Sequence, residues 1–437
     1  MVFNLKIVFL LKICKIRLGG RMVFDKLKLD RSFELYEEAK KLIPGGMAGI
    51  RRPYNFVPGE YPIFFEEAKG GKVKDVDGNW YIDMLCAYGP IIIGHREKEI
   101  DRAVIDQIKN KGFCMSLVQP VQNQLAKKVC ELIPSAEMVV FTKTGSDSTT
   151  LAIRIARAFT GKKKILRCGY HGWHDWCVEV KGGIPEKLYE DVFEFHYNNF
   201  EEIEELVKKH KDDLAAIITT PIGHPLANPV EMPKPGFLEF LREITAKNNA
   251  VLIFDEIRTG FRFSLGGAQK VFGVIPDISC FGKAMANGYE ISMVVGRKDV
   301  MDVVTPPNNV FVSSTYFPNS VAMVAALKTI EMMERYNVLE GVKRRGEVFA
   351  NIINNYLKNK DLPVEFSGDP FMPYITFKKD EEGKYKEYRI KFYTNLIRKK
   401  VFLQPYHHGY VCYRHSIKDM RYAGEMVCEA LEDVFKK

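Results

Sequence analysis

Lys283 and Asp255 are the residues whose types and positions most directly suggest chemistry. Lys283 follows the apolar run Ile278–Phe281, and a lysine that points inward from such a strand loses hydration. Its pKa then falls, and the neutral amine becomes a nucleophile toward aldehydes. Asp255 ends the apolar run 251–254, where a carboxylate can keep a pyridine nitrogen protonated. Taken singly, Lys283 is more often a surface lysine, and Asp255 equally suits a buried cap or a magnesium ligand.

Two polar turns have the composition to complete such a site. One holds Gly145 and Ser146 between an expected strand and helix, where backbone amides and a hydroxyl favour an anion such as phosphate. The other holds Tyr170 and His171 at a strand end, where an aromatic ring can lie flat against a planar cofactor and His171 is a further candidate contact. A helix cap and a core aromatic are the ordinary alternatives. His171 and His174 could suggest a metal site, but we expect none.

These residues need a sheet that brings strand ends together. Short apolar strands alternate with helical patterns from about residue 75 to 320, which predicts an α/β fold with a mostly parallel central sheet flanked by helices. Ligands of such sheets lie at the carboxyl ends of the strands. The expected strands cover residues 138–141, 165–166, 214–218, 251–254, 278–281 and 292–295, and the expected helices include 32–43, 149–159, 237–245 and 319–335.

The rest of the chain predicts a smaller α+β domain built from both ends. We expect residues 22–74 to pack with that small domain, 75–320 to form the large cofactor-binding domain, and 321–437 to form the C-terminal small domain. Asp77-Gly78 predicts a hairpin turn. Residues 1–21 are expected to be a disordered extension. Alternatively, the translation start is wrongly assigned, and the protein begins at Met22. A crude signal or surface anchor is the alternative for this stretch.

Composition excludes several classes of function. Lys plus Arg number 64 and Asp plus Glu 55, so the formal net charge is only +9 on 437 residues. The basic residues are scattered, so we expect no nucleic-acid partner. No stretch reaches the ~20 apolar residues that a membrane span needs, so we expect no membrane partner. The nine cysteines form no CxxC pair and are typical of buried thiols in a reducing compartment, which favours a cytoplasmic protein.

An ordered set of motifs around Asp255 and Lys283 resembles the signature of the class III aminotransferases that use pyridoxal 5'-phosphate (PLP). The resemblance runs from about Ser32 to the C-terminus, and it is strongest to the branch of glutamate-1-semialdehyde 2,1-aminomutase. The motifs are Phe254-Asp255-Glu256-Ile257-Arg258-Thr259-Gly260-Phe261-Arg262, Gly266-Gly267-Ala268-Gln269, Phe272-Gly273-Val274, Pro276-Asp277 and Gly282-Lys283, with Leu42-Ile43-Pro44-Gly45-Gly46, Asp75-Val76-Asp77-Gly78, Gly89-Pro90 and Gly94-His95 shared with that branch.

The resemblance implies fold type I and a role for each cofactor residue. Lys283 would bind PLP as a Schiff base and shuttle the proton, and Asp255 would pair with the pyridine nitrogen. Tyr170 would stack on the ring, and the groups around Gly145 and Ser146 would hold the phosphate.

The resemblance also implies a second subunit and two substrate contacts. Thr315 matches a threonine that reaches the phosphate of the neighbouring subunit, which implies a homodimer with the site at its interface. Arg52 matches an arginine that binds the substrate carboxylate in the aminomutase, although Arg51 is adjacent. Tyr88 stands where the aminomutase has a tryptophan in its substrate wall.

We therefore expect an aminotransferase that moves an amino group between a small-molecule amino donor and a carbonyl acceptor, namely an oxo acid, an aldehyde or a keto sugar. The alternatives are an intramolecular aminomutase or an amino acid racemase, and, from another class, a PLP-binding regulatory protein without turnover. Gly49, Tyr88, His407 and His408 depart from the aminomutase pattern. The sequence names neither donor nor acceptor.

Overall fold

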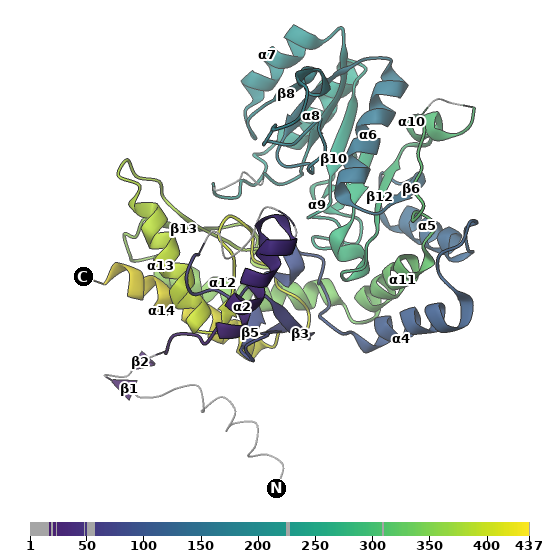
Figure 1. Cartoon of the computed structure of the whole chain (residues 1–437). Coiled ribbons are helices and arrows are strands. Elements are labelled where there is room, and N and C mark those ends of the chain that lie inside the picture. Colours follow the sequence, from purple (N-terminus) through teal and green to yellow (C-terminus); the bar gives the residue numbers. More distant parts are fainter. Residues whose placement is uncertain are drawn as a thin grey trace.

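The computed structural model describes residues 17–18, 21–22, 24–47, 49, 57–223, 228–307 and 310–436. Two bodies of secondary structure are visible, an upper one built around a large sheet and a lower one that gathers both ends of the chain (Figure 1). Most of the expected N-terminal extension lies outside the described residues. At its end, β1 (Arg17–Leu18) pairs in antiparallel orientation with β2 (Arg21–Met22), which reaches one residue beyond it.

The upper body contains a seven-stranded sheet in the order β6-β12-β11-β10-β9-β7-β8. Only β12 runs antiparallel to its neighbours, so the prediction of a mostly parallel sheet is confirmed. Every residue of β9, β10, β11 and β12 is buried, as expected for strands covered on both faces. The strands are β6 (Met138–Thr142), β7 (Lys164–Cys168), β8 (Val192–Glu194), β9 (Leu214–Thr219), β10 (Val251–Asp255), β11 (Ile278–Phe281) and β12 (Ser292–Gly296).

Helices cover both faces of this sheet because successive strand residues point to opposite sides. Ile253 packs in one apolar cluster with the helix α6 (Gly145–Thr160), whereas Leu252 packs in another with α7 (Phe200–His210) and α8 (Phe237–Lys247). The shorter elements of this body are α9 (Ala268–Phe272), α10 (Lys298–Met301), η4 (Glu186–Leu188), η5 (Lys283–Ala286) and η6 (Asp302–Val304).

The lower body joins distant parts of the chain in one sheet. Its order is β15-β5-β4-β3, and Val401 of β15 pairs in parallel with Ile82 of β5. The hairpin predicted at Asp77-Gly78 connects β4 to β5, and Gly78 has the positive φ of 90° that this turn needs. The strands are β3 (Phe65–Lys69), β4 (Lys72–Asp75), β5 (Trp80–Asp83) and β15 (Val401–Phe402), with a separate pair β13 (Val364–Ser367) and β14 (Tyr374–Phe377).

Helices complete the lower body and connect it to the upper one. The long helix α11 packs against α4, α5 and η5, so it contacts the segment that carries Lys283. Among the described residues, none of the helices combines the length and apolar character needed to cross a membrane. The helices are α2 (Asp30–Leu42), α4 (Lys98–Asp106), α5 (Val121–Leu132), α11 (Ser320–Arg335), α12 (Val338–Leu357), α13 (Lys384–Arg398) and α14 (Ile417–Phe435), with short turns η1 (Pro44–Gly46), η2 (Cys86–Tyr88) and η3 (Gln107–Lys111).

Candidate active site

Lys283 and Asp255 lie at the same edge of the central sheet. Asp255 is the last residue of β10, and Lys283 comes two residues after β11 ends. These two strands are parallel neighbours, with Asp255 paired to Cys280. Lys283 has a φ of 43°, a backbone conformation uncommon for a residue with a Cβ, which redirects the chain as η5 begins. The parallel register therefore brings together the two residues that the sequence singled out.

The amine of Lys283 is tuned toward its neutral form. Its pKa is lowered from 10.5 to about 8, mainly by burial and then by the positive charge of Arg258, while Asp255 opposes the change. A lysine with a pKa near 8 has a substantial neutral fraction at moderately alkaline pH, and the neutral amine is the form that attacks a carbonyl carbon.

Asp255 is held by two fixed donors. Its side chain is buried, the Ile257 amide donates to Oδ1 at 3.0 Å, and His171 Nδ1 lies 2.8 Å from Oδ2. The second ring nitrogen of His171 lies 3.0 Å from the carbonyl oxygen of Cys168. Both nitrogens of the imidazole thus face acceptors, so the ring donates at both only when both carry a proton. His171 was expected as a cofactor contact, and its pairing with Asp255 was not predicted.

The turn before α6 is shaped for an anion. Thr144 caps the helix, since its hydroxyl accepts from the Asp147 amide at 3.2 Å and its own amide donates to Asp147. The backbone amides of Gly145 and Ser146 lie in the first turn of α6, before the Asp147 amide that bonds to Thr144. The helix dipole favours negative charge at this end of the helix.

Ile257 joins this turn to the lysine segment. A Cβ added at Gly145 would lie 3.2 Å from Ile257 Cδ1, and one added at Gly282 would lie at the same distance from that atom. The residue before Lys283 and the first residue of α6 therefore both lie close to the same side chain.

The turn that holds Tyr170 and His171 is hydrogen-bonded to the start of α6. The Ser146 hydroxyl accepts from the Trp173 amide at 3.3 Å, and the Thr149 hydroxyl donates to the His171 carbonyl at 2.6 Å. Tyr170 remains 37% exposed, with the Arg258 guanidinium 5.9 Å from its ring centroid. The Tyr170 ring is thus partly exposed, one residue before the His171 that pairs with the buried Asp255.

Tyr88, an expected substrate contact, lies in the lower body just after β5. Cys86, Ala87 and Tyr88 all have positive φ values, a strained run that turns the chain after β5. The Tyr88 hydroxyl donates to Gln404 Oε1 at 2.9 Å, and the ring meets that of His407 edge to face at 4.8 Å. Gln404 carries no sequence motif and was not predicted.

Two predicted residues are not part of this cluster. Thr315 is exposed in the turn before α11, and it makes no hydrogen bond to the cluster within the described residues. Arg52 and its neighbour Arg51 lie outside the residues that the structure describes.

The remaining motif residues hold the backbone around the site. The buried carboxylate of Glu256 accepts from the amides of Ala268 and Gln269 at 2.9 and 2.8 Å, and burial raises its pKa. Arg262 is fully buried and donates to the carbonyls of Gly89 and Val411 at 2.8 and 3.0 Å. The sequence motif is therefore largely a scaffold.

One group of potential metal ligands occurs among the described residues. Cys86, Cys412 and His415 are buried, with ligand atoms within 4.8 Å of one another. The sequence spacing gave no sign of this group. His415 Nδ1 accepts from the Cys412 amide at 3.0 Å, and Nε2 lies 3.1 Å from the Gly71 carbonyl oxygen. Both ring nitrogens therefore have protein partners.

The residues at the sheet edge fit PLP on chemical grounds. The set comprises an amine with a lowered pKa, a buried carboxylate, an aromatic face and a helix N-terminus with a hydroxyl beside it. These groups suit, in turn, the aldehyde, the ring nitrogen, the ring face and the phosphate of that cofactor.

Comparison with known proteins agrees with this set of groups. Residues 56–413 match the family model "Aminotransferase class-III", and the chain belongs to this family. A 3-aminobutyryl-CoA aminotransferase from Cloacimonas acidaminovorans is 62% identical over 412 residues, covering 94% of this chain and 99% of its own. A glutamate-1-semialdehyde 2,1-aminomutase from Methanosphaera stadtmanae is 34% identical, covering 94% of this chain and 100% of its own.

Solved structures agree as well. The Sphingopyxis sp. MTA144 FumI protein, in its PLP internal aldimine form, matches with a TM-score of 0.87 and 30% identity, covering 93% of this chain and 97% of its own. An omega-transaminase from Sphaerobacter thermophilus matches with a TM-score of 0.84 and 25% identity, covering 92% of this chain and 97% of its own. The protein is a PLP-dependent aminotransferase that moves an amino group between an amino donor and a carbonyl acceptor. The aminomutase alternative is not favoured.

Proposed function

We propose that the protein interconverts a 3-aminoacyl thioester of coenzyme A and the corresponding 3-oxoacyl thioester, with an amino acid and its oxo acid as the second substrate pair. The supporting observation is the 62% identity, over nearly the full length of both chains, to a 3-aminobutyryl-CoA aminotransferase. The reaction balances, because the amino group lost by one partner is gained by the other and the carbonyl oxygen moves in the reverse direction.

The proposed roles follow from where each residue lies. When bound, PLP supplies an electron-withdrawing ring that stabilises negative charge on the substrate carbon. Lys283 holds the cofactor through its amine, and the same Nζ takes the proton from the substrate carbon when it is released. Asp255, oriented by His171, keeps the ring nitrogen protonated. Tyr170 flanks the ring, and the groups at Gly145 and Ser146 hold the phosphate.

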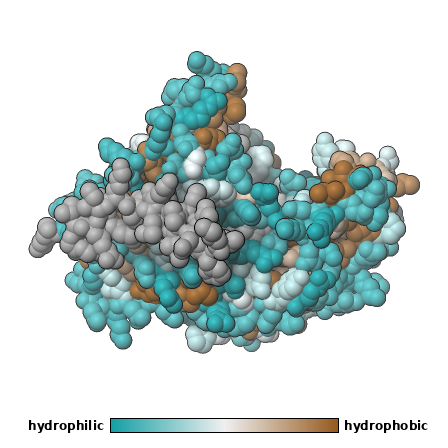
Figure 2. All heavy atoms as spheres, turned by 90° about the horizontal axis from the view of Figure 1, so that it is seen from below, coloured by the Kyte–Doolittle hydropathy of each residue, from teal (hydrophilic) through white to brown (hydrophobic). Residues whose placement is uncertain are grey.

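A second subunit is also proposed. Large hydrophobic side chains are exposed in residues 105–118, namely Ile105, Ile108, Phe113, Met115, Leu117 and Val118, and Phe311 and Tyr316 flank Thr315 with 78% and 61% exposure. Hydrophobic patches also interrupt the hydrophilic surface seen from below (Figure 2). A homodimer would cover such surface and would bring Thr315 of one subunit to the phosphate of the other. Light scattering during size exclusion tests this, and a monomer at micromolar concentration would contradict it.

We also propose a cytoplasmic location and a division of the chain into two domains. The free cysteines, four of them buried, suit a reducing cytoplasm. Residues 75–320 are proposed as the large domain and residues 22–74 with 321–437 as the small one. The strand β5 is an exception, because it falls within 75–320 but pairs in the sheet of the small domain.

The substrate proposal is tested with purified protein supplied with PLP. 3-Aminobutyryl-CoA and a panel of oxo acids are incubated with enzyme, and the 3-oxoacyl thioester and new amino acid are quantified by mass spectrometry. We expect equal amounts of both products and no reaction without an oxo acid. Turnover of free 3-aminobutyrate but not of the thioester would contradict the proposed substrate while leaving the aminotransferase assignment intact.

A further inference from the structure

Arg258 is a partly exposed cation without an ion-pair partner. Within the described residues its guanidinium makes no hydrogen bond or ion pair, and its contact is with the face of Tyr170, whose ring centroid lies 5.9 Å from Cζ. Three other arginines of the upper body each meet a carboxylate, namely Arg167 at Glu194, and Arg242 and Arg297 at Asp277. A guanidinium has five donors and no acceptor, so an unpaired one is suited to an anion that a ligand supplies.

The turn that carries Arg258 lies against the end of β11 and the residue after it. A Cβ added at Gly282 would lie 3.2 Å from Ile257 Cδ1, and one added at Gly260 would collide with the Phe281 ring. Arg258 therefore lies between two residues that are packed against the segment leading into the reactive lysine.

The space beside Arg258 is open to a ligand on the side of Tyr170. Tyr170 is 37% exposed and Arg258 is partly exposed, so a molecule arriving from solvent can reach both side chains. The buried carboxylate of Asp255 does not neutralise Arg258, because it is held by a backbone amide and by His171, and no ion pair joins it to the guanidinium.

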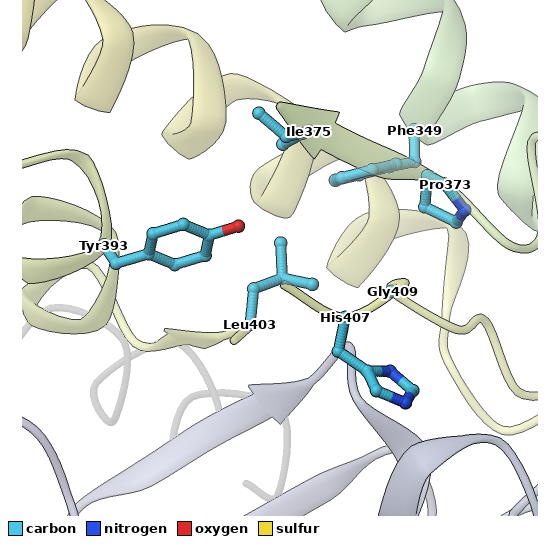
Figure 3. A pocket seen from close by; sticks show the side chains of 7 residues that line it. All are labelled: Phe349, Pro373, Ile375, Tyr393, Leu403, His407 and Gly409. Carbon is cyan, nitrogen blue, oxygen red and sulfur yellow. The ribbon is translucent and has the colours of Figure 1, made fainter. Parts of the chain in front are cut away.

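The charges around Arg258 favour an anion. The ring of His407 points away from the small cavity that it borders (Figure 3) and meets the Tyr88 ring edge to face at 4.8 Å. Burial lowers the pKa of His407 and the positive charge of Arg258 lowers it further, so this histidine is neutral. The same two causes, in the same order, lower the pKa of Lys283. A bound carboxylate would offset the positive charge that acts on both groups.

The chemistry of the reaction indicates which anion this is. The phosphate of PLP has its own groups at Gly145 and Ser146. A 3-aminoacyl thioester carries no carboxylate on its acyl chain, because the carboxyl carbon is part of the thioester. The amino acid and its oxo acid both carry a carboxylate on the reacting carbon. A guanidinium binds such a group through two parallel hydrogen bonds.

We propose that Arg258 binds the carboxylate of the amino acid and of its oxo acid, and that it thereby selects these substrates over neutral carbonyl compounds. This inference rests on the proposed second substrate pair and is independent of the identity of the thioester. A site that holds an unpaired polar group discriminates strongly against ligands that leave this group unpaired.

The test uses protein loaded with pyridoxamine 5'-phosphate, so that the oxo acid half-reaction is followed alone through the absorbance of the PLP that forms. The measured quantity is the ratio of the second-order rate constant for pyruvate to that for pyruvamide, its neutral amide. We expect Arg258→Met to lower this ratio at least about tenfold, because charge-assisted hydrogen bonds to the carboxylate are lost. Any effect of Arg258 on Lys283 falls on both compounds and cancels in the ratio.

Two further variants serve as controls for this measurement. Arg258→Lys keeps the positive charge and should retain part of the ratio, although a lysine lacks the two-pronged geometry. Arg154→Met removes an exposed arginine on α6 and should leave the ratio unchanged. Cofactor absorbance and the thermal unfolding midpoint identify variants that fail to fold, and Arg258→Gln then replaces Arg258→Met.

The possible failures are distinguishable. A wild-type enzyme that reacts with pyruvate no faster than with pyruvamide overturns the inference, and one that reacts with no oxo acid overturns the proposed second substrate pair as well. A wild type that prefers pyruvate, with an unchanged ratio in Arg258→Met, overturns the role of Arg258 alone. A ratio that is lost in Arg52→Met but kept in Arg258→Met also overturns it, and assigns the carboxylate to Arg52.

Discussion

The imidazole of His171 and the carboxylate of Asp255 lie 2.8 Å apart although 84 positions separate them in the sequence. His171 is 1% exposed and its ring is nearly parallel to that of Trp176, so its orientation is fixed by packing. With the Ile257 amide on the other oxygen, the carboxylate has little freedom to rotate. An acceptor fixed in this way can keep a cofactor nitrogen protonated without reorganising during turnover.

Replacing Asp255 and replacing His171 should each reduce activity, but by different amounts. Asp255→Asn removes the charge that stabilises a protonated ring nitrogen, and we expect kcat to fall by about 10²–10³-fold. His171→Phe removes only the group that orients the carboxylate, and we expect a loss of about 10-fold. His196→Phe is the control, because His196 is exposed and pairs with Glu202 on the surface. Equal losses from the first two variants would contradict this division of roles.

The lowered pKa of Lys283 predicts how the cofactor-free protein captures PLP. The folded pKa is about 8 and the unfolded value 10.5, so the neutral amine accumulates as pH rises through 8. The rate of covalent capture should therefore rise with an apparent pKa near 8, which stopped-flow absorbance measures. A midpoint above 10 would contradict the effect of burial.

The same shift predicts a stability trend for the cofactor-free protein. The unfolded chain binds more protons than the folded one between pH 8 and 10.5, so the contribution of Lys283 to stability improves as pH rises through this window. Below pH 8 the full cost of burying the charged amine is present. Lys283→Met should remove this trend in urea titrations performed at a series of pH values.

Arg262 should matter for stability more than any exposed arginine. It donates to two carbonyls from different parts of the chain and packs 4.9 Å from the Tyr410 ring centroid. Arg262→Met would leave both carbonyls without these donors, and we expect a loss of about 2–4 kcal/mol in the free energy of unfolding. Arg421→Met, at an exposed position on α14, should change it by less than about 0.5 kcal/mol. Equal effects in urea denaturation would contradict this ranking.

Gly267 and Gly273 separate backbone strain from a steric clash. Both have positive φ, 81° and 72°, but a Cβ at Gly267 would lie 2.5 Å from Glu256 Oε1, whereas one at Gly273 would meet nothing within 4 Å. Gly273→Ala should cost about 1–2 kcal/mol of stability from the backbone alone. Gly267→Ala should cost at least about 1 kcal/mol more, because Glu256 must move away from its amide donors. Similar losses for both would show that Glu256 adapts freely.

The sequence was most informative where chemistry depends on the ends of strands. Apolar runs ending at Asp255 and just before Lys283 predicted two strands of a mostly parallel sheet, and the register of these strands brings both residues to one edge of the sheet. Periodicity also predicted α2, α11 and the hairpin at Asp77-Gly78 within a few residues.

Contacts between distant segments could not be predicted from a single sequence. The pairing of His171 with Asp255, and of Tyr88 with Gln404 across 316 positions, depends on how β7, β10, β5 and β15 are placed in space. Neither Gln404 nor the group of Cys86, Cys412 and His415 has a local pattern that distinguishes it from ordinary buried residues. The positive φ values at residues 86–88 are equally invisible, because no glycine marks them.

The central claim is that Lys283 is the amine that binds PLP, and Lys400 offers an internal comparison. Burial lowers the pKa of Lys400 to about 8 as well, but Lys400 donates to Asn79 in the lower body, away from Asp255 and the turn at Gly145. The most direct measurement is borohydride reduction of the protein with bound PLP, followed by peptide mapping of the modified lysine. We predict modification at Lys283 and its loss in Lys283→Ala, with Lys400 unmodified. Modification at Lys400, or at no lysine, would contradict the account.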